Sequence, residues 1–255
     1  MPLELMTIPC LKDNYAFLVH NTDTRETIAV DVPEANPILV VLASREWPLT
    51  HILLTHHHGD HIDGVAKLRA ATGAKVVGAK ADVARLPELD IEVTEGDVLD
   101  LLGTPVRVID VPGHTVGHIA FHLPEPELAF TGDSLMAGGC GRLFEGTPEQ
   151  MWDSLTKLSA LPPETRICSG HEYTLSNLRF ALTLEPENEM LISRIAAVEA
   201  ARDDNTPTVP STLSEELATN PFLRANLPVV KAALGMVDDD DAAVFAEVRR
   251  RKDSF

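Results

Sequence analysis

Seven consecutive residues decide the fold of this chain, and they read Thr55-His56-His57-His58-Gly59-Asp60-His61. Residues two apart in an extended segment point to the same side, so His56 and His58 can bind one metal ion while His57 points away. Asp60 and His61 follow, and we expect them to turn toward a second ion. Imidazole and carboxylate groups suit zinc, iron or manganese rather than calcium. The stretch therefore predicts a metal centre in a loop that follows a strand.

Three later segments place a histidine or an aspartate at the end of an expected strand. They are Pro112-Gly113-His114-Thr115, Thr131-Gly132-Asp133-Ser134 and Ser169-Gly170-His171-Glu172. In each of them a glycine lets the backbone turn sharply beside a crowded ion. Asp133 has two carboxylate oxygens and is the natural bridge between two ions. With His57 left out, these segments and the first stretch offer five histidines and two aspartates, too many donors for one closed tetrahedral site.

The remaining histidines are weaker candidates. His118 lies four residues after His114, but Pro112 and Gly113 make that region a loop rather than a helix, so His118 ranks below His114. His57 is expected to pack beside the ligands rather than bind an ion. The other three are interpreted as surface or core residues: His20, His51 and His122.

Composition narrows the classes of partner. The net charge is −18, which argues against nucleic acid because phosphate binding needs clustered Lys and Arg. No run of 18 apolar residues occurs, so no membrane span is expected. The first five residues do not resemble a signal peptide. The three cysteines are far apart and odd in number, which predicts buried free thiols and a cytoplasmic location.

The pattern of elements changes near residue 172. Before it, short β-like runs alternate with loops and helices, and Thr147-Pro148-Glu149-Gln150 predicts a helix start with a capping box. Beyond Ser169 apolar residues keep a helical spacing, and no further strand is expected. We therefore predict a catalytic domain over residues 1–172 and a helical, substrate-binding domain over residues 173–255.

Residues 55–61 resemble the signature of the metallo-β-lactamase superfamily, and His114, Asp133 and His171 match its later ligands in order and context. The resemblance implies an α+β fold, a four-layer αββα sandwich with two metal ions at one edge of its sheets. Carried over position by position, the first ion would have His56, His58 and His114. The second would have Asp60, His61 and His171, with Asp133 as the bridge. Zinc is expected, with iron or manganese as alternatives.

Other segments resemble the glyoxalase II family, the hydroxyacylglutathione hydrolases, within this superfamily. Cys140–Thr147 resembles the segment after the bridging aspartate, and Gly170–Thr174 resembles the last ligand motif. In the C-terminal run 248–253, Arg249 and Lys252 match the basic pair that holds glutathione carboxylates. The resemblance also points to Arg142 and Phe144 as substrate contacts, in place of the family's lysine and tyrosine. Tyr173, two residues after His171, is expected to reach the same end of the substrate.

The resemblance implies a cytoplasmic thioesterase that converts S-D-lactoylglutathione to D-lactate and glutathione, the second step of methylglyoxal detoxification. A hydroxide bridging the ions would attack the thioester carbonyl, and Asp60 and Asp133 are the candidate catalytic residues. The thiolate leaving group needs little protonation, because the pKa of its thiol is about 8.5. We expect a monomer that binds a small glutathione thioester and neither nucleic acid nor a membrane.

Two other readings remain open. A mononuclear iron persulfide dioxygenase of the same superfamily also uses glutathione, and lactonases and β-lactamases are further relatives. Iron content and oxygen consumption would distinguish the dioxygenase. A non-catalytic metal- or nucleotide-binding module would need a closed tetrahedral shell, which fits poorly with the number of donors.

Overall fold

A six-stranded sheet opens the chain in the computed structural model, which describes residues 3–255. β1, β2 and β3 pair antiparallel, and β3 to β6 pair parallel in chain order. The strands are β1 (Leu3–Cys10), β2 (Asn14–Asn21), β3 (Thr27–Val30), β4 (Leu49–Leu53), β5 (Lys75–Ala79) and β6 (Ile91–Val93). β4 runs directly into the histidine-rich stretch, as the sequence predicts.

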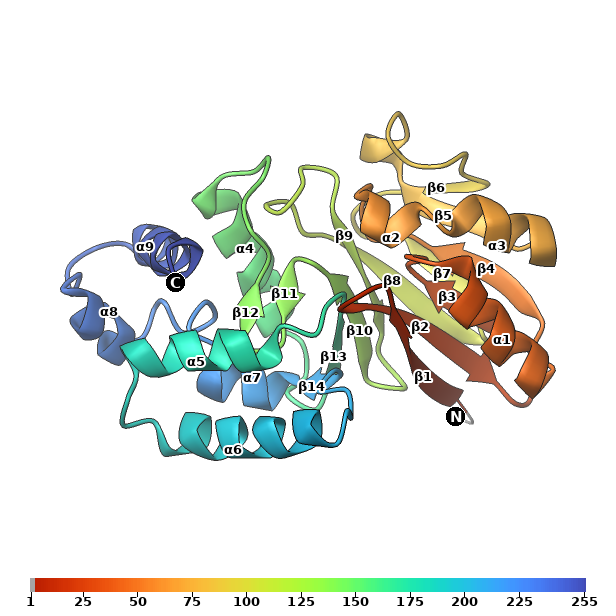
Figure 1. The fold of residues 1–255 in the computed structure, drawn as a ribbon. Coiled ribbons are helices and arrows are strands. Elements are labelled where there is room, and N and C mark those ends of the chain that lie inside the picture. Colours follow the sequence, from red (N-terminus) through yellow and green to blue (C-terminus); the bar gives the residue numbers. More distant parts are fainter. Residues whose placement is uncertain (1–2) are drawn as a thin grey trace. The chain divides into compact units, whose positions relative to one another are not determined.

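Two helices cover this sheet, α1 (Ala35–Arg45) and α3 (Val65–Thr72) (Figure 1). Ile38 of α1 and Leu68 of α3 are fully buried and belong to one apolar cluster with Ile52 of β4. Gly73 ends α3 in the left-handed conformation with φ 73°, which costs glycine little. Burial of this cluster fixes the strand ends that carry the histidine loop.

An antiparallel meander follows in the order β7, β8, β9, β10. Its strands are β7 (Val98–Leu101), β8 (Thr104–Asp110), β9 (Ile119–Leu123) and β10 (Leu128–Gly132). All residues of β9 and β10 are buried. β8 and β10 each end just before a predicted ligand motif, so the meander positions both motifs.

The rest of the chain is mostly helical. Its helices are α4 (Pro148–Ser159), α5 (Thr174–Leu184), α6 (Glu189–Asp203), α7 (Leu213–Thr219), α8 (Pro228–Leu234) and α9 (Asp241–Asp253). α4 packs against α9 and α5 against α6 (Figure 1). The predicted capping box at the start of α4 is present, with the backbone nitrogen of Gln150 donating to Thr147 Oγ1 at 3.3 Å.

One sequence prediction about strands is wrong. A strand occurs beyond Ser169, because β14 (Ser211–Thr212) pairs with β13 (Arg166–Ser169). Two residues are too short to display the alternation by which a strand is recognised. Two further short strands, β11 (Leu135–Met136) and β12 (Gly139–Cys140), form a hairpin directly after Asp133.

Contacts divide the chain into two compact units. The first comprises Met1–Asp110 and Gly117–Gly132, and the second comprises Val111–Val116 and Asp133–Phe255. The predicted domain boundary at residue 172 stays a prediction. The sequence places the expected ligands in both units, four in the first and three in the second, so each half of the site is described separately below.

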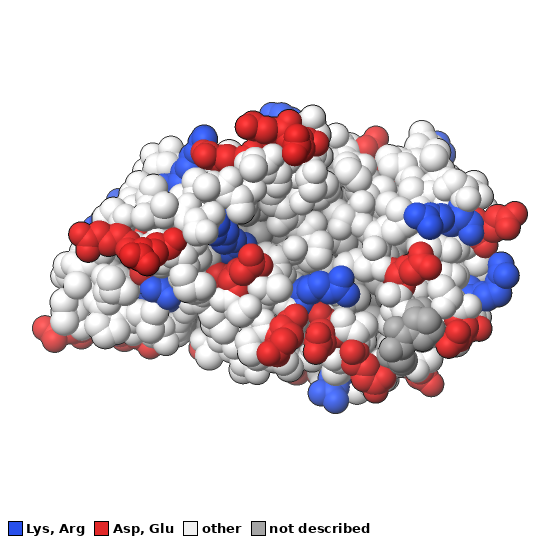
Figure 2. Space-filling model, turned by 90° about the horizontal axis from the view of Figure 1, so that it is seen from below, with Lys and Arg blue, Asp and Glu red and all other residues white. Residues whose placement is uncertain are grey.

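Positive charge is spread out on one face of the molecule (Figure 2), and the cysteines are buried. On the face seen in Figure 2, Lys and Arg side chains are scattered among Asp and Glu rather than gathered in a patch. Within residues 3–255, no helix is both long and apolar enough to cross a membrane. The three cysteines are free and buried, as predicted.

Candidate metal centre

The histidine stretch leaves β4 as a short loop and enters the single-turn helix α2 (Gly59–Ile62). His56 Nε2 and His58 Nδ1 lie 3.2 Å apart. Two nitrogens bound tetrahedrally to one zinc ion at ~2.05 Å would lie about 3.3 Å apart. The arrangement of His56 and His58 therefore fits a shared ion. His118 stacks on the ring of His56, with centroids 4.6 Å apart, and so packs against a candidate ligand.

His61 is fixed by a carboxylate that the sequence analysis missed. Its Nδ1 lies 2.8 Å from Asp31 Oδ2, and both side chains are almost fully buried. Asp31 also accepts hydrogen bonds from the backbone nitrogen and Oγ1 of Thr55, at 2.9 Å and 2.8 Å. A carboxylate at Nδ1 holds the proton there and leaves Nε2 with its lone pair, as a metal ligand requires.

Asp60 and His57 have different neighbours. Asn14 Nδ2 donates to the carbonyl oxygen of Asp60 at 3.0 Å and to its Oδ2 at 3.1 Å. Asn14 belongs to the early part of the chain, at the start of β2. His57 Nδ1 instead lies 2.8 Å from Oδ2 of the buried Asp82. His57 thus bonds Asp82 rather than joining the candidate ligands, as expected if it points away from His56 and His58.

In the second unit, Asp133 lies between two histidines. Its Oδ2 is 3.5 Å from His114 Nε2 and 3.3 Å from His171 Nε2. His114 Nδ1 donates to the carbonyl oxygen of Arg142 at 2.8 Å, which again leaves Nε2 as the acceptor. One carboxylate oxygen is therefore close to two histidine nitrogens, the arrangement expected of a bridging ligand.

Gly141 packs against this group at backbone distance. Its nitrogen donates to the carbonyl oxygen of Asp133 at 2.9 Å. A Cβ at this position would lie 2.1 Å from that oxygen and 2.8 Å from His114 Nδ1. Only glycine fits beside Asp133 and His114. Close packing therefore explains why a glycine stands between Cys140 and Arg142.

Two of the predicted substrate residues share one partner. Arg249 is buried, with Nη1 donating to the carbonyl oxygen of Cys140 at 2.9 Å and Nη2 at 2.8 Å from Asp253 Oδ1. The exposed Arg142 has its Nε 3.8 Å from the same carboxylate oxygen. Asp253, which the sequence analysis did not single out, therefore joins Arg142 to Arg249.

Lys252 bonds Ser176, which lines a surface pocket together with Tyr173. Lys252 Nζ donates to Ser176 Oγ at 3.1 Å, and burial, together with the positive charges of Arg249 and Arg142, lowers the pKa of Lys252 to about 8. Tyr173 and Ser176 line one surface pocket. The Tyr173 ring stacks on that of His171 with centroids 4.7 Å apart, so this side chain touches a candidate ligand and the pocket together.

Phe144 is exposed, and its ring meets the ring of His114 edge-on with centroids 5.3 Å apart. Within the second unit the structure thus brings the five predicted substrate residues into two groups. Phe144 and Tyr173 flank candidate ligands, whereas Arg142, Arg249 and Lys252 gather around the end of α9.

Comparisons with known proteins assign the family. The family model "Metallo-beta-lactamase superfamily" matches residues 22–171, and "Hydroxyacylglutathione hydrolase C-terminus" matches residues 172–255. A hydroxyacylglutathione hydrolase of Cereibacter sphaeroides is 68% identical over 100% of both chains. The crystal structure of BLEG-1 B3 metallo-beta-lactamase is similar with a TM-score of 0.67 at 22% identity, covering 86% of this chain and 99% of that one.

A second solved structure, TTHA1623 in a di-iron-bound form, is 30% identical with a TM-score of 0.56 and covers 66% of this chain and 91% of its own. The α+β metallo-β-lactamase fold with a helical C-terminal part, predicted from the resemblance, is confirmed. Full-length identity and both family models agree, and the chain belongs to the hydroxyacylglutathione hydrolase family of the metallo-β-lactamase superfamily.

Proposed function

We propose that this protein hydrolyses S-(2-hydroxyacyl)glutathione thioesters, with S-D-lactoylglutathione as the substrate and D-lactate and glutathione as the products. Family membership over the whole chain supports this reaction. The single observation that carries it is the position of Asp133 Oδ2, close to Nε2 of both His114 and His171. Such an oxygen suits a centre of two ions, and ions bound there would supply an activated water for hydrolysis.

The ligand assignment is part of the proposal. His56, His58 and His114 would hold one divalent ion, Asp60, His61 and His171 the other, and Asp133 both. The di-iron form of the related TTHA1623 supports two ions per chain. Bound there, two ions would lower the pKa of a water molecule and stabilise negative charge on the thioester carbonyl oxygen. Zinc remains the expected metal, with iron or manganese as alternatives.

The chain's own residues prepare the donors. The carboxylate of Asp31 and the carbonyl oxygen of Arg142 each accept a hydrogen bond from Nδ1 of a histidine, so His61 and His114 present unprotonated Nε2 atoms. Asn14 holds Asp60 through both its backbone and its carboxylate. These fixed side chains reduce the rearrangement needed when substrate arrives. A thiolate leaving group needs no dedicated general acid, because the pKa of its thiol is about 8.5.

The test of this function uses the purified protein on a panel of thioesters, with and without a chelator. Hydrolysis of lactoylglutathione should exceed that of thioesters without glutathione, and verified metal removal should abolish it. Activity that survives metal removal would exclude the metal mechanism. One iron per chain with oxygen consumption would instead indicate the persulfide dioxygenase. The cytoplasmic location and the monomeric state stay predictions of the sequence.

Substrate recognition gives a kinetic prediction for Lys252. Its ammonium group lies near the guanidinium groups of Arg142 and Arg249, where it can bind a glutathione carboxylate far from the reacting carbonyl. Contacts of this kind hold the ground state and the transition state equally. Lys252→Ala should therefore raise KM for lactoylglutathione about tenfold to a hundredfold and leave kcat nearly intact.

The pH profile of KM provides an independent readout. Because the pKa of Lys252 is lowered to about 8, KM should rise above that pH as the charge is lost, and Lys252→Arg should remove this rise. Arg250→Ala, an exposed change on the same helix, should leave KM unchanged. An equal penalty on a thioester that lacks the carboxylates would mean that Lys252 has a structural role. Arg249→Ala should also lower stability, since its guanidinium is buried.

A further inference from the structure

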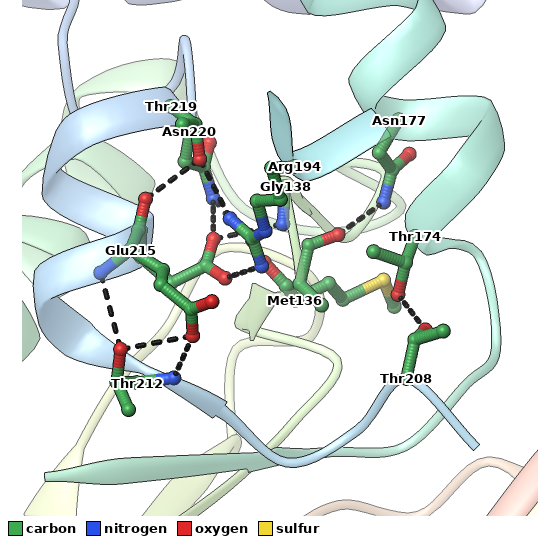
Figure 3. A network of polar contacts seen from close by, with 12 residues as sticks. Met136, Gly138, Thr174, Asn177, Arg194, Thr208, Thr212, Glu215, Thr219 and Asn220 are labelled. Carbon is green, nitrogen blue, oxygen red and sulfur yellow. Dashed lines mark hydrogen bonds and ion pairs between the residues drawn. The ribbon is translucent and has the colours of Figure 1, made fainter. Parts of the chain in front are cut away.

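A buried polar network in the second unit binds the backbone of the turn after Asp133 (Figure 3). Asn220 Nδ2 donates to the carbonyl oxygens of Met136 and Gly139, at 3.2 Å and 2.9 Å. Asn177 Nδ2 donates to the carbonyl oxygen of Ala137 at 3.1 Å. The Gly138 nitrogen donates to Glu216 Oε2 at 2.8 Å. Side chains from the helical part therefore bind four consecutive residues of the β11–β12 hairpin.

Glu216 is the centre of this network and is completely buried. Its Oε1 accepts from Arg194 Nη2 at 2.5 Å, and its Oε2 also accepts from Asn220 Nδ2 at 3.0 Å. Arg194, itself 9% exposed, is held by Thr219 Oγ1 at 2.6 Å. The carboxylate is thus shared between an arginine and the backbone of the hairpin.

Stability alone does not explain a buried ion pair here. Removing two charges from water costs several kcal/mol, and apolar replacements of such pairs are often neutral or stabilising. Apolar side chains could fill the space of Glu216 and Arg194, but they could not accept a hydrogen bond from the Gly138 nitrogen. The Glu216 carboxylate and its arginine partner are therefore better explained by a requirement to fix the hairpin.

The hairpin is continuous with the second half of the candidate metal centre. Asp133 lies two residues before the start of β11, and the Gly141 nitrogen after β12 donates back to the Asp133 carbonyl oxygen at 2.9 Å. The next carbonyl oxygen, that of Arg142, holds Nδ1 of His114. Displacement of the hairpin would move the bridging carboxylate and the acceptor that orients His114 together.

The backbone of the hairpin is closely packed against side chains of α5. An added Cβ at Gly138 would lie 2.7 Å from Leu178 Cδ2, and one at Gly139 would lie 2.6 Å from Asn177 Nδ2. Gly138 also has φ 67°, a conformation that other residues adopt at a cost. The glycines allow the helices to approach the hairpin closely, so that Glu216 and both asparagines reach its backbone.

We propose that Glu216 is a positioning residue, whose carboxylate, paired with Arg194, fixes the β11–β12 hairpin and thereby Asp133 and the orientation of His114. The inference rests on the proposed metal centre, since it explains how the helical part of the chain holds one half of that centre. Glu216 acts through the hairpin backbone and touches neither substrate nor metal. A fault in this network would reduce metal binding and kcat without altering the contacts proposed for glutathione.

The experiment compares Glu216→Gln with Glu215→Gln. Glutamine keeps the size but turns an amide donor toward Arg194 or Gly138. Glu215 is the adjacent exposed residue and only completes the capping box of α7. We expect Glu216→Gln to weaken metal binding and lower kcat about tenfold to a hundredfold with KM unchanged, and Glu215→Gln to leave all three values unchanged. Metal affinity is measured by competition with a chromophoric chelator, and the ligand field by the spectrum of the cobalt-substituted protein.

An apolar double variant separates positioning from stability. Arg194→Met with Glu216→Met should melt near the temperature of the wild-type protein, but its metal affinity and kcat should stay below the wild-type values. Should this variant not fold, Asn220→Ala, which keeps the ion pair, serves the same purpose. Wild-type metal affinity and cobalt spectrum in the folded variants would overturn the proposal. A changed spectrum in Glu216→Gln supports it even if the wild-type protein fails to hydrolyse lactoylglutathione, so the two proposals fail separately.

Discussion

Asp133→Ala should nearly abolish thioester hydrolysis and leave the protein largely without its metal. The Asp133 Oδ2 atom lies 3.5 Å from His114 Nε2 and 3.3 Å from His171 Nε2, so one substitution would remove a donor from both proposed ions. Outer partners of a metal ligand already contribute about tenfold to a hundredfold to affinity or activity. Loss of a shared ligand should exceed that range in kcat. The measurements are metal content after gel filtration and kcat on lactoylglutathione.

His57→Ala is the control, because His57 stands between two candidate ligands, His56 and His58, but bonds Asp82. This variant should keep its metal and most of its kcat. Similar metal loss in the two variants would contradict the alternation argument on the histidine stretch. A normal metal content in Asp133→Ala would contradict the bridging role and require another shared donor.

Asp31→Asn should weaken metal binding about tenfold to a hundredfold, although Asp31 is not a proposed ligand. Three donors converge on its carboxylate, from His61 Nδ1, Thr55 Oγ1 and the Thr55 nitrogen. The asparagine amide nitrogen cannot accept a hydrogen bond, so at least one buried donor loses its partner. If that donor is His61 Nδ1, the imidazole can shift its proton to Nε2 and stop acting as a ligand. Metal affinity and kcat report this change.

The control for lost charge is Asp63→Asn. Asp63 is exposed and directly follows α2, yet its carboxylate has no bond to His61 among the described contacts. This substitution should alter metal affinity little. If both variants lose affinity equally, the effect of Asp31 is general electrostatic attraction rather than control of the His61 tautomer. Thermal unfolding of the metal-free proteins would show how much of the loss comes from stability.

The sequence indicates the half of the proposed site that follows a repeated local rule. His114, Asp133 and His171 each follow a strand and a glycine, so they could be found without coordinates. Asp31 also follows a strand, but Val32 and Pro33 come after it and no glycine marks the turn. Asp31 itself adopts φ 54°, which aspartate tolerates better than most residues. Its partner His61 lies 30 residues away, and that distance hid the pair.

The hairpin network shows a second limit. Asn177, Glu216 and Asn220 lie in or next to helices, where polar residues usually face water, and no spacing rule separates them from exposed neighbours such as Glu215. Their burial depends on the packing of α5 and α7 around backbone distant in sequence. The helix α1 was missed for another reason, because Pro37 and the consecutive apolar residues 38–42 obscure the helical period.

Thiol burial has a consequence for oxidative conditions. Burial raises the pKa of Cys10 and of Cys140 to about 11 and that of Cys168 further still. Only the thiolate attacks a disulfide, and access is needed as well. The protein therefore carries no described thiol that can form a mixed disulfide with oxidised glutathione. An enzyme that releases glutathione as a product would therefore keep its own cysteines from reacting with oxidised glutathione.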